Sequence, residues 1–176
     1  RYFQDMGSYA WAAPYVDLLY EAGVITGTGG QRYRPADAVS RGDFMLMLYR
    51  AFQLTPASGA GFPDVPPGSY YAQAIQAARA AGIASGYPDG GFHPQEHVTR
   101  QDAMVLQERT MQATGWSLGA ANTGYLSGFR DGGMVAPYAQ EAMSHMIEYG
   151  IITGTPEQKL NPIQSISRAE DRKSVV

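Results

Sequence analysis

Three short segments of the sequence place a hydroxyl, an arginine and a carboxylate at a fixed spacing. They contain Ser40, Arg41 and Asp43; Thr99, Arg100 and Asp102; and Ser167, Arg168 and Glu170. This order is typical of a capping box, in which the hydroxyl caps a helix and the acid stands at the third helical position. A helix N-terminus offers unpaired N–H groups and partial positive charge, and an arginine beside it can hold a carboxylate by two hydrogen bonds. The segments are therefore candidate anion-binding sites.

A purely structural interpretation of these segments stands beside the functional one. A capping box that leaves its arginine exposed to solvent explains any single match, because short motifs often occur by chance. Three copies in register favour a function without deciding the role of each arginine. Both interpretations stay open at the level of sequence.

The elements that must position these segments also recur three times. In every copy two glycines stand four residues apart, a proline follows eight residues later, and the Ser/Thr-Arg pair begins five residues after the proline. Self-similarity at this period predicts a repeat architecture. We expect repeat one over residues 1–54, repeat two over 55–114, a linker over 115–128 and repeat three over 129–176.

Each repeat is predicted to contain two helices joined by a loop. The first helix covers about 11–22, 70–81 and 138–149, and a glycine ends it in each copy: Gly23, Gly82 and Gly150. The second helix begins at Ser40, Thr99 or Ser167. In repeat three charged residues follow Glu170, so we expect a last helix that is short or truncated, or that frays. The predicted fold class is all-α, with helix-loop-helix repeated three times.

Composition excludes several classes of function. The net charge is −3 and the chain has two lysines, Lys159 and Lys173, which is unlike the basic surface of a nucleic-acid-binding protein. Cysteine is absent, so neither disulfides nor thiolate metal sites are expected. No apolar run approaches the length needed to cross a bilayer, so no membrane insertion is expected. The sequence is typical of a soluble module from a longer protein.

Taken together, these features resemble three tandem S-layer homology modules of a bacterial surface protein. The further residues that carry the resemblance are a Phe-x-Asp before each first helix, namely Phe3/Asp5, Phe62/Asp64 and Phe129/Asp131, and an aromatic residue that opens that helix. The resemblance implies a pseudo-three-fold spindle with a central helical bundle. It also implies a secreted, wall-associated protein that binds a secondary cell-wall polysaccharide, often carrying pyruvate ketals, in grooves between modules.

The resemblance implies a set of glycan-binding residues. The three arginines would hold the pyruvate carboxylate, aromatic faces would cover a sugar ring, and the second glycine of each loop would let backbone approach the ligand. These residues are Arg41, Arg100, Arg168, Trp11, Tyr70, Tyr138, Gly27, Gly86 and Gly154. Burial of the aromatic side chains between repeats is an equally open interpretation. Because of the charged tail after Glu170, we expect the groove that uses Arg168 to be the weakest.

Catalysis and metal binding find little support in the sequence. His93 and His97 are four residues apart, but Pro94 lies between them and a third ligand is lacking. Asp43, Asp102 and Glu170 could form a glycosidase pair, but they recur in equivalent places, whereas an acid and a nucleophile need different environments. We expect no catalytic residues, no metal and no cofactor.

The predicted function is non-covalent anchoring of a surface protein to the cell wall by a module that is monomeric in isolation. Repeated equivalent sites suit multivalent binding. Two alternatives remain: a protein-protein assembly module of a surface layer, and a targeting module of a wall-associated hydrolase.

Overall fold

The computed structural model describes residues 2–175, with side chains described as far as Asp171. Within this part the chain is all-α, as predicted. The α-helices are α1 (Ala13–Glu21), α2 (Arg41–Ala51), α3 (Ala72–Ala80), α4 (Arg100–Ala113), α5 (Gln140–Glu148) and α6 (Arg168–Val175). The short 3-10 helices are η1 (Gly7–Tyr9), η2 (Thr123–Gly128), η3 (Gly132–Met134) and η4 (Pro137–Ala139).

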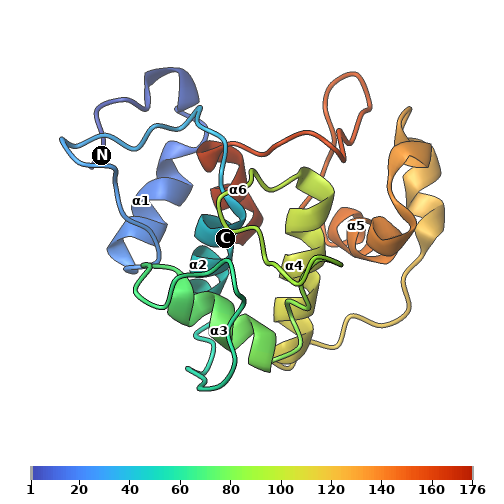
Figure 1. Ribbon diagram of the computed structural model, residues 1–176. Coiled ribbons are helices and arrows are strands. Elements are labelled where there is room, and N and C mark those ends of the chain that lie inside the picture. The colour runs from blue at the N-terminus through green and yellow to red at the C-terminus, as the bar shows by residue number, and fades with distance from the viewer. Residues whose placement is uncertain (1, 176) are drawn as a thin grey trace.

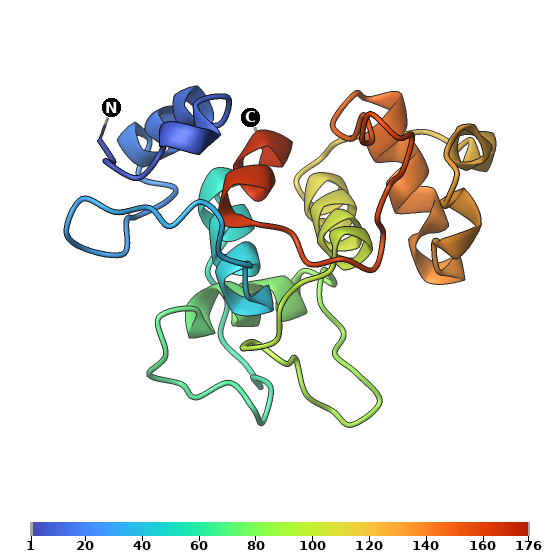
Figure 2. The ribbon, with the colours of Figure 1, turned by 90° about the horizontal axis from the view of Figure 1, so that it is seen from above.

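Two helices per repeat are arranged in an inner and an outer set. The second helices α2, α4 and α6 lie in the middle of the molecule, and the first helices α1, α3 and α5 lie around them (Figure 1). The view from above shows the same central trio (Figure 2). Each outer helix begins two residues after its aromatic residue, so Trp11, Tyr70 and Tyr138 lie in the turn before the helix.

Packing between the repeats is cyclic. The outer helix of each repeat packs against the inner helix of the preceding one: α3 against α2, α5 against α4, and α1 against α6. The last pair joins the two ends of the chain, so the three repeats close into a ring. Side chains of Arg172 to Val175 lie outside the described residues, and α6 is the shortest of the inner helices at 8 residues.

A ring of three backbone hydrogen bonds closes the centre of the molecule. The Val39 amide donates to the Ile166 carbonyl at 3.0 Å, the Val98 amide to the Val39 carbonyl at 2.9 Å, and the Ile166 amide to the Val98 carbonyl at 3.3 Å. All three side chains are buried. We call these three residues the collar. The collar sets the position at which each inner helix begins, two residues later in the chain.

The Phe-x-Asp motif organises the loop of each repeat. Asp64 accepts hydrogen bonds from the amides of Phe92 at 2.9 Å and His93 at 2.8 Å. Asp5 and Asp131 do the same in their own repeats. Burial alone would raise the pKa of Asp64, but these backbone donors outweigh it and lower the pKa below the usual range. The motif therefore holds the loop that precedes the inner helix.

The second glycine of each loop is required by the phenylalanine of the same motif. A Cβ atom at Gly27, Gly86 or Gly154 would lie 2.5, 2.7 and 2.5 Å from the Cε1 atom of Phe3, Phe62 and Phe129 respectively. Gly86 and Gly154 also have positive φ, at +85° and +77°. The fold itself therefore accounts for these glycines, without any approach of a ligand to the backbone.

The segment predicted as a linker is tied to repeat three. The hydroxyl of Tyr149 donates to the Leu118 carbonyl at 2.9 Å, and His145 Nε2 lies 3.2 Å from the Gly119 carbonyl. His145 Nδ1 also contacts the buried Glu108 carboxylate of α4 at 2.5 Å. Trp116, in the same segment, is largely exposed. Within residues 2–175, no helix combines the length and apolar character that crossing a membrane requires.

Candidate functional site

Three grooves lie between the repeats, and each is built from all three repeats. We number them by the repeat that supplies the glycine loop. The first groove, of about 260 Å³, is lined by Thr26, Asp43, Arg50, Tyr70 and Arg168. The second, of about 250 Å³, is lined by Arg41, Gly86, Tyr87, Asp102, Arg109 and Tyr138. The third, of about 480 Å³, is lined by Trp11, Arg100, Gly154, Leu160, Glu170 and Asp171.

The predicted arginines all line grooves, but each serves the groove of the next repeat. Arg41 of repeat one lines the second groove, Arg100 the third, and Arg168 the first. We expected a weak Arg168 groove because of the charged residues that follow Glu170. Arg168 lines the first groove, however, whereas Glu170 and Asp171 line the third. The tail follows Glu170, which lines the third groove beside Arg100.

Two of the arginines are fixed by backbone carbonyls at their Nε atoms. Arg41 Nε donates to the Phe92 carbonyl at 3.0 Å, and its guanidinium lies 4.8 Å from the ring centroids of both Tyr87 and Phe92. Arg168 Nε donates to the Tyr33 carbonyl at 2.8 Å, with its guanidinium 4.6 Å from the Tyr33 ring. These contacts hold each guanidinium in one orientation at the groove wall.

The helix N-termini differ from the prediction. The side chains of Ser40, Thr99 and Ser167 accept hydrogen bonds from the third-position amides of α2, α4 and α6. The first two amides of α2, from Arg41 and Gly42, donate to the carbonyls of Glu96 and Pro94, both at 2.8 Å. The first two amides of α4 and α6 are paired with the next repeat in the same way. The expectation of unpaired amides was wrong, because the loop of the neighbouring repeat occupies them.

The aromatic residues face solvent beside the capping carboxylates. Trp11, Tyr70 and Tyr138 are 48%, 66% and 60% exposed, so burial between repeats does not explain them. The Tyr138 hydroxyl donates to Asp102 Oδ1 at 2.5 Å, and Tyr70 makes the equivalent bond to Asp43. Although most of the ring is exposed, partial desolvation of the hydroxyl and its hydrogen bond to Asp102 raise the pKa of Tyr138 to about 12. Both tyrosines are therefore uncharged hydrogen-bond donors at neutral pH.

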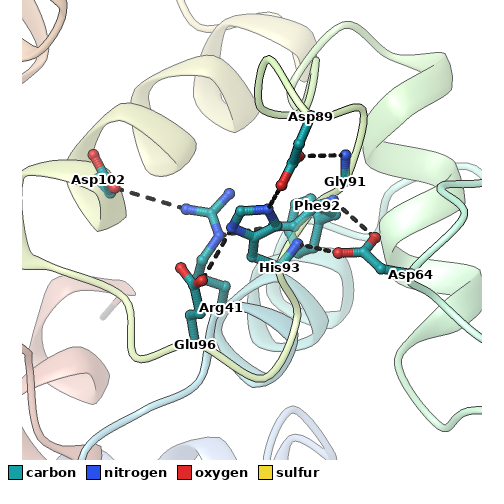
Figure 3. A network of polar contacts seen from close by, with 8 residues as sticks. All are labelled: Arg41, Asp64, Asp89, Gly91, Phe92, His93, Glu96 and Asp102. Carbon is teal, nitrogen blue, oxygen red and sulfur yellow. Dashed lines mark hydrogen bonds and ion pairs between the residues drawn. The ribbon is translucent and has the colours of Figure 1, made fainter.

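A stacked arrangement in the second groove was missed by the sequence analysis. The Tyr87 ring stacks on His93, with centroids 4.1 Å apart, and faces Arg41 as well. His93 contacts the carboxylates of Asp89 at 2.6 Å and Glu96 at 3.1 Å (Figure 3). The hydrogen bond to Asp89 is the main cause that raises the pKa of His93. These contacts hold Tyr87 at the groove wall.

A second arginine in two grooves was also missed. Arg50 donates to the Val24 carbonyl at 3.5 Å, and Arg109 donates to the Ile83 carbonyl at 3.2 Å. Each follows the capping-box arginine of its own repeat by nine residues, a spacing visible in the sequence. Among the described residues, no group of three or more His, Asp or Glu side chains could hold a metal ion.

Comparison with known proteins gives the family to which this architecture belongs. The family model described as "S-layer homology domain" matches residues 2–45, 61–104 and 128–170. The chain is 28% identical over 173 residues to an endoglucanase of Bacillus sp. (strain KSM-635), covering 98% of this chain and 18% of the enzyme. It is 28% identical over 171 residues to the surface-layer 125 kDa protein of Lysinibacillus sphaericus, covering 96% and 14%.

A shorter match involves the outer membrane protein SlpA of Thermus thermophilus, which is 43% identical over 53 residues, covering 30% of this chain and 6% of that protein. The fold and its relatives define a binding and anchoring module of the cell surface or cell wall. The chain belongs to the S-layer homology domain family, with three tandem copies. It spans less than a fifth of the length of each of these relatives.

Proposed function

We propose that this chain anchors the protein of which it is part by binding an acidic secondary cell-wall polysaccharide in the grooves between its repeats. The carrying observation is that each groove combines a guanidinium, an exposed aromatic ring and a carboxylate from three different repeats. A sugar that bears a pyruvate ketal offers a carboxylate to the guanidinium and an apolar ring face to the aromatic side chain. Its hydroxyls can donate hydrogen bonds to the carboxylate of the groove.

The geometry of Arg41 and Arg168 supports this assignment. Their Nε atoms are fixed by carbonyls of the neighbouring repeat, so little side-chain freedom is lost when the remaining N–H groups bind a ligand. Tyr70 and Tyr138 donate hydrogen bonds to the nearby aspartates, so each of these carboxylates has a close partner other than an arginine. The closest approach of Asp102 to Arg41 is 3.8 Å. Each arginine is thus oriented and available to an anionic sugar.

The relatives fit the proposal at a coarse level. They include a surface-layer protein and an endoglucanase, and this chain resembles only a small share of each. A module shared by proteins of such different kinds suits a common attachment role. Linked grooves on one chain would add avidity on a repetitive polymer.

The test is binding of purified wall polysaccharide to the chain and to the double variant Arg41→Gln/Arg168→Gln. Each charge-assisted contact contributes about 1.5–3 kcal/mol, so each groove should lose affinity by roughly 10- to 150-fold. The matched control is Arg130→Gln, which removes the same charge from an exposed residue outside the three groove linings. Calorimetry would measure all three proteins, before and after chemical removal of the pyruvate.

Undiminished binding by the double variant, or equal binding after pyruvate removal, would contradict the proposal. Association of the chain with itself in sedimentation experiments without sugar, abolished in the double variant, would favour the alternative of a protein-protein assembly module. Turnover of peptidoglycan by this chain alone would indicate a hydrolase instead.

A further inference from the structure

The three grooves differ in how the capping carboxylate is satisfied. In the first and second grooves a tyrosine of the next repeat donates its hydroxyl to the aspartate. The arginines of these grooves then make their hydrogen bonds to backbone carbonyls: Arg41 to Phe92, and Arg168 to Tyr33 and Thr26. In the second groove Asp102 also forms a long ion pair with Arg41, at 3.8 Å, but the close hydrogen bonds of both groups are to other partners.

The third groove changes both members of this arrangement. Trp11 stands where the other grooves have a tyrosine, so the phenolic hydroxyl is missing. Glu170 stands where they have aspartate, and its side chain is one methylene longer. Arg100 Nη2 forms an ion pair with Glu170 Oε2. A carboxylate of the protein itself thus occupies the position at which a ligand carboxylate would meet the arginine.

The surroundings strengthen this difference. Asp171, which is 1% exposed, is a second acidic residue of the third-groove lining. Among the side chains that the structure describes, Arg100 is the only basic one that lines this groove, whereas the first groove has Arg50 and Arg168. The third groove is also the largest of the three, at about 480 Å³. An incoming anion would have to displace Glu170 and approach Asp171.

We propose that the grooves fall into two ligand classes: the first and second bind the carboxylate-bearing sugar, and the third binds an uncharged sugar unit. Hydroxyl groups both donate and accept, so they can bond to Glu170 and Arg100 without separating them. The exposed face of Trp11 would cover the apolar side of the ring. This inference rests on the proposed function and adds to it the specificity of one groove.

A pair of probes with the same shape and different charge tests the inference. The first is the methyl glycoside of a hexose carrying a 4,6-linked pyruvate ketal, and the second is its uncharged methyl ester. The chain has two tryptophans, of which Trp116 lies outside the groove linings. In the Trp116→Phe variant, Trp11 fluorescence therefore reports on the third groove alone. The side-chain Nε resonances of Arg41 and Arg168 report on the other two.

The ester should change Trp11 emission at a concentration about tenfold lower than the acid, because only the acid meets like charge. The acid should be the stronger binder at Arg41 and Arg168. An acid that acts on Trp11 at the same or lower concentration than the ester would overturn the inference, as would a Trp11 that responds to neither probe. An acid that fails to shift Arg41 and Arg168 would instead count against the proposed function.

Substitution of Glu170 in the Trp116→Phe background supplies the second arm. Glu170→Gln removes the competing charge, so the affinity of the acid for the third groove should rise about tenfold and the preference for the ester should disappear. Glu170→Asp introduces the residue found at this position in the other repeats, keeps the helix cap and should shift the preference in the same direction. Thermal unfolding checks that both variants fold. An unchanged preference in two folded variants would contradict the inference.

Discussion

The collar and the rim of the grooves are both built three times, yet only the collar is nearly the same in each copy. Its three members are buried aliphatic residues whose backbones form one closed set of hydrogen bonds. At the rim, the aromatic residue is Trp11 in one groove and Tyr70 or Tyr138 in the others, and the partner of the carboxylate changes with it. Burial and backbone pairing restrict which residues can form the collar. The aromatic and carboxylate residues at the rim of the grooves face solvent, so their types can differ between repeats.

Arg41 and Arg168 link the folded backbone to the rim of the grooves. Arg41 anchors its Nε in the fold and turns the rest of its guanidinium toward the second groove. Substitutions can therefore be ranked by their distance from the collar, and the expected loss of stability should fall as the position moves toward the rim.

The largest effect is expected from a charge placed in the collar. Val98→Asp would bury a carboxylate without a partner in a site that is 0% exposed, costing about 3–5 kcal/mol of stability. Urea unfolding followed by circular dichroism measures it. His97→Asp adds the same charge to the exposed neighbouring residue and should stay close to the parent. Equal stability of the two variants would mean that the collar is not essential to the fold.

The next effect is expected at Arg41, which bonds to the backbone of repeat two and lines the second groove. Arg41→Lys keeps the charge but loses the planar guanidinium. With it go the hydrogen bond to the Phe92 carbonyl and the contact with two aromatic rings. Stability should fall by about 1–3 kcal/mol, since the carbonyl loses a charged donor. Arg130→Lys, at an exposed site, is the control. A loss of sugar binding without loss of stability would show that Arg41 serves the groove alone.

A smaller, pH-dependent effect is expected at the loop carboxylates. The pKa of Asp64 is lowered in the folded state, so the stability it contributes is present above the ordinary carboxyl pKa and is lost as the pH falls through the folded value. Asp64→Asn should cost about 1 kcal/mol at pH 7, because solvent screens this exposed site. The difference from the parent should shrink toward pH 3. Glu157→Gln, at an exposed loop position, should show no such trend.

The smallest effect is expected at His93, at the outer end of the stack on Tyr87. Its pKa is raised, so its contribution to stability is complete below the ordinary histidine pKa and is lost as the pH rises through the folded value. His93→Asn, which introduces the residue that repeat three has here, should lower the melting temperature slightly at pH 5.5 and not at pH 9. A larger difference at pH 9 would contradict this sign.

The sequence was sufficient for the helices and for one arginine and one aromatic residue of each groove, but not for Tyr87, Arg50 and Arg109. Spacing alone predicted two helices per repeat, because glycine stops and capping residues act locally. Capping hydroxyls and groove arginines were also found from the three-fold recurrence. The start of each outer helix was placed two residues early, because an aromatic residue does not itself distinguish the turn before a helix from its first turn.

What the sequence could not give depends on contacts between repeats. The pairing of the first amides of α2 with Pro94 and Glu96 requires that repeat two close over repeat one, which no local pattern encodes. For the same reason Arg168 was not expected beside Thr26, 142 residues away. The packing of Phe62 against Gly86 likewise appears only in three dimensions.

Each capping-box arginine lines the groove of a different repeat, so removing one repeat would affect all three grooves. Cutting away residues 129–176 would take Arg168 from the first groove, Tyr138 from the second and the entire loop from the third. Such a two-repeat fragment would not retain two thirds of the binding sites. It would keep no complete groove, so we expect removal of this one repeat to abolish binding and not to reduce it by one third.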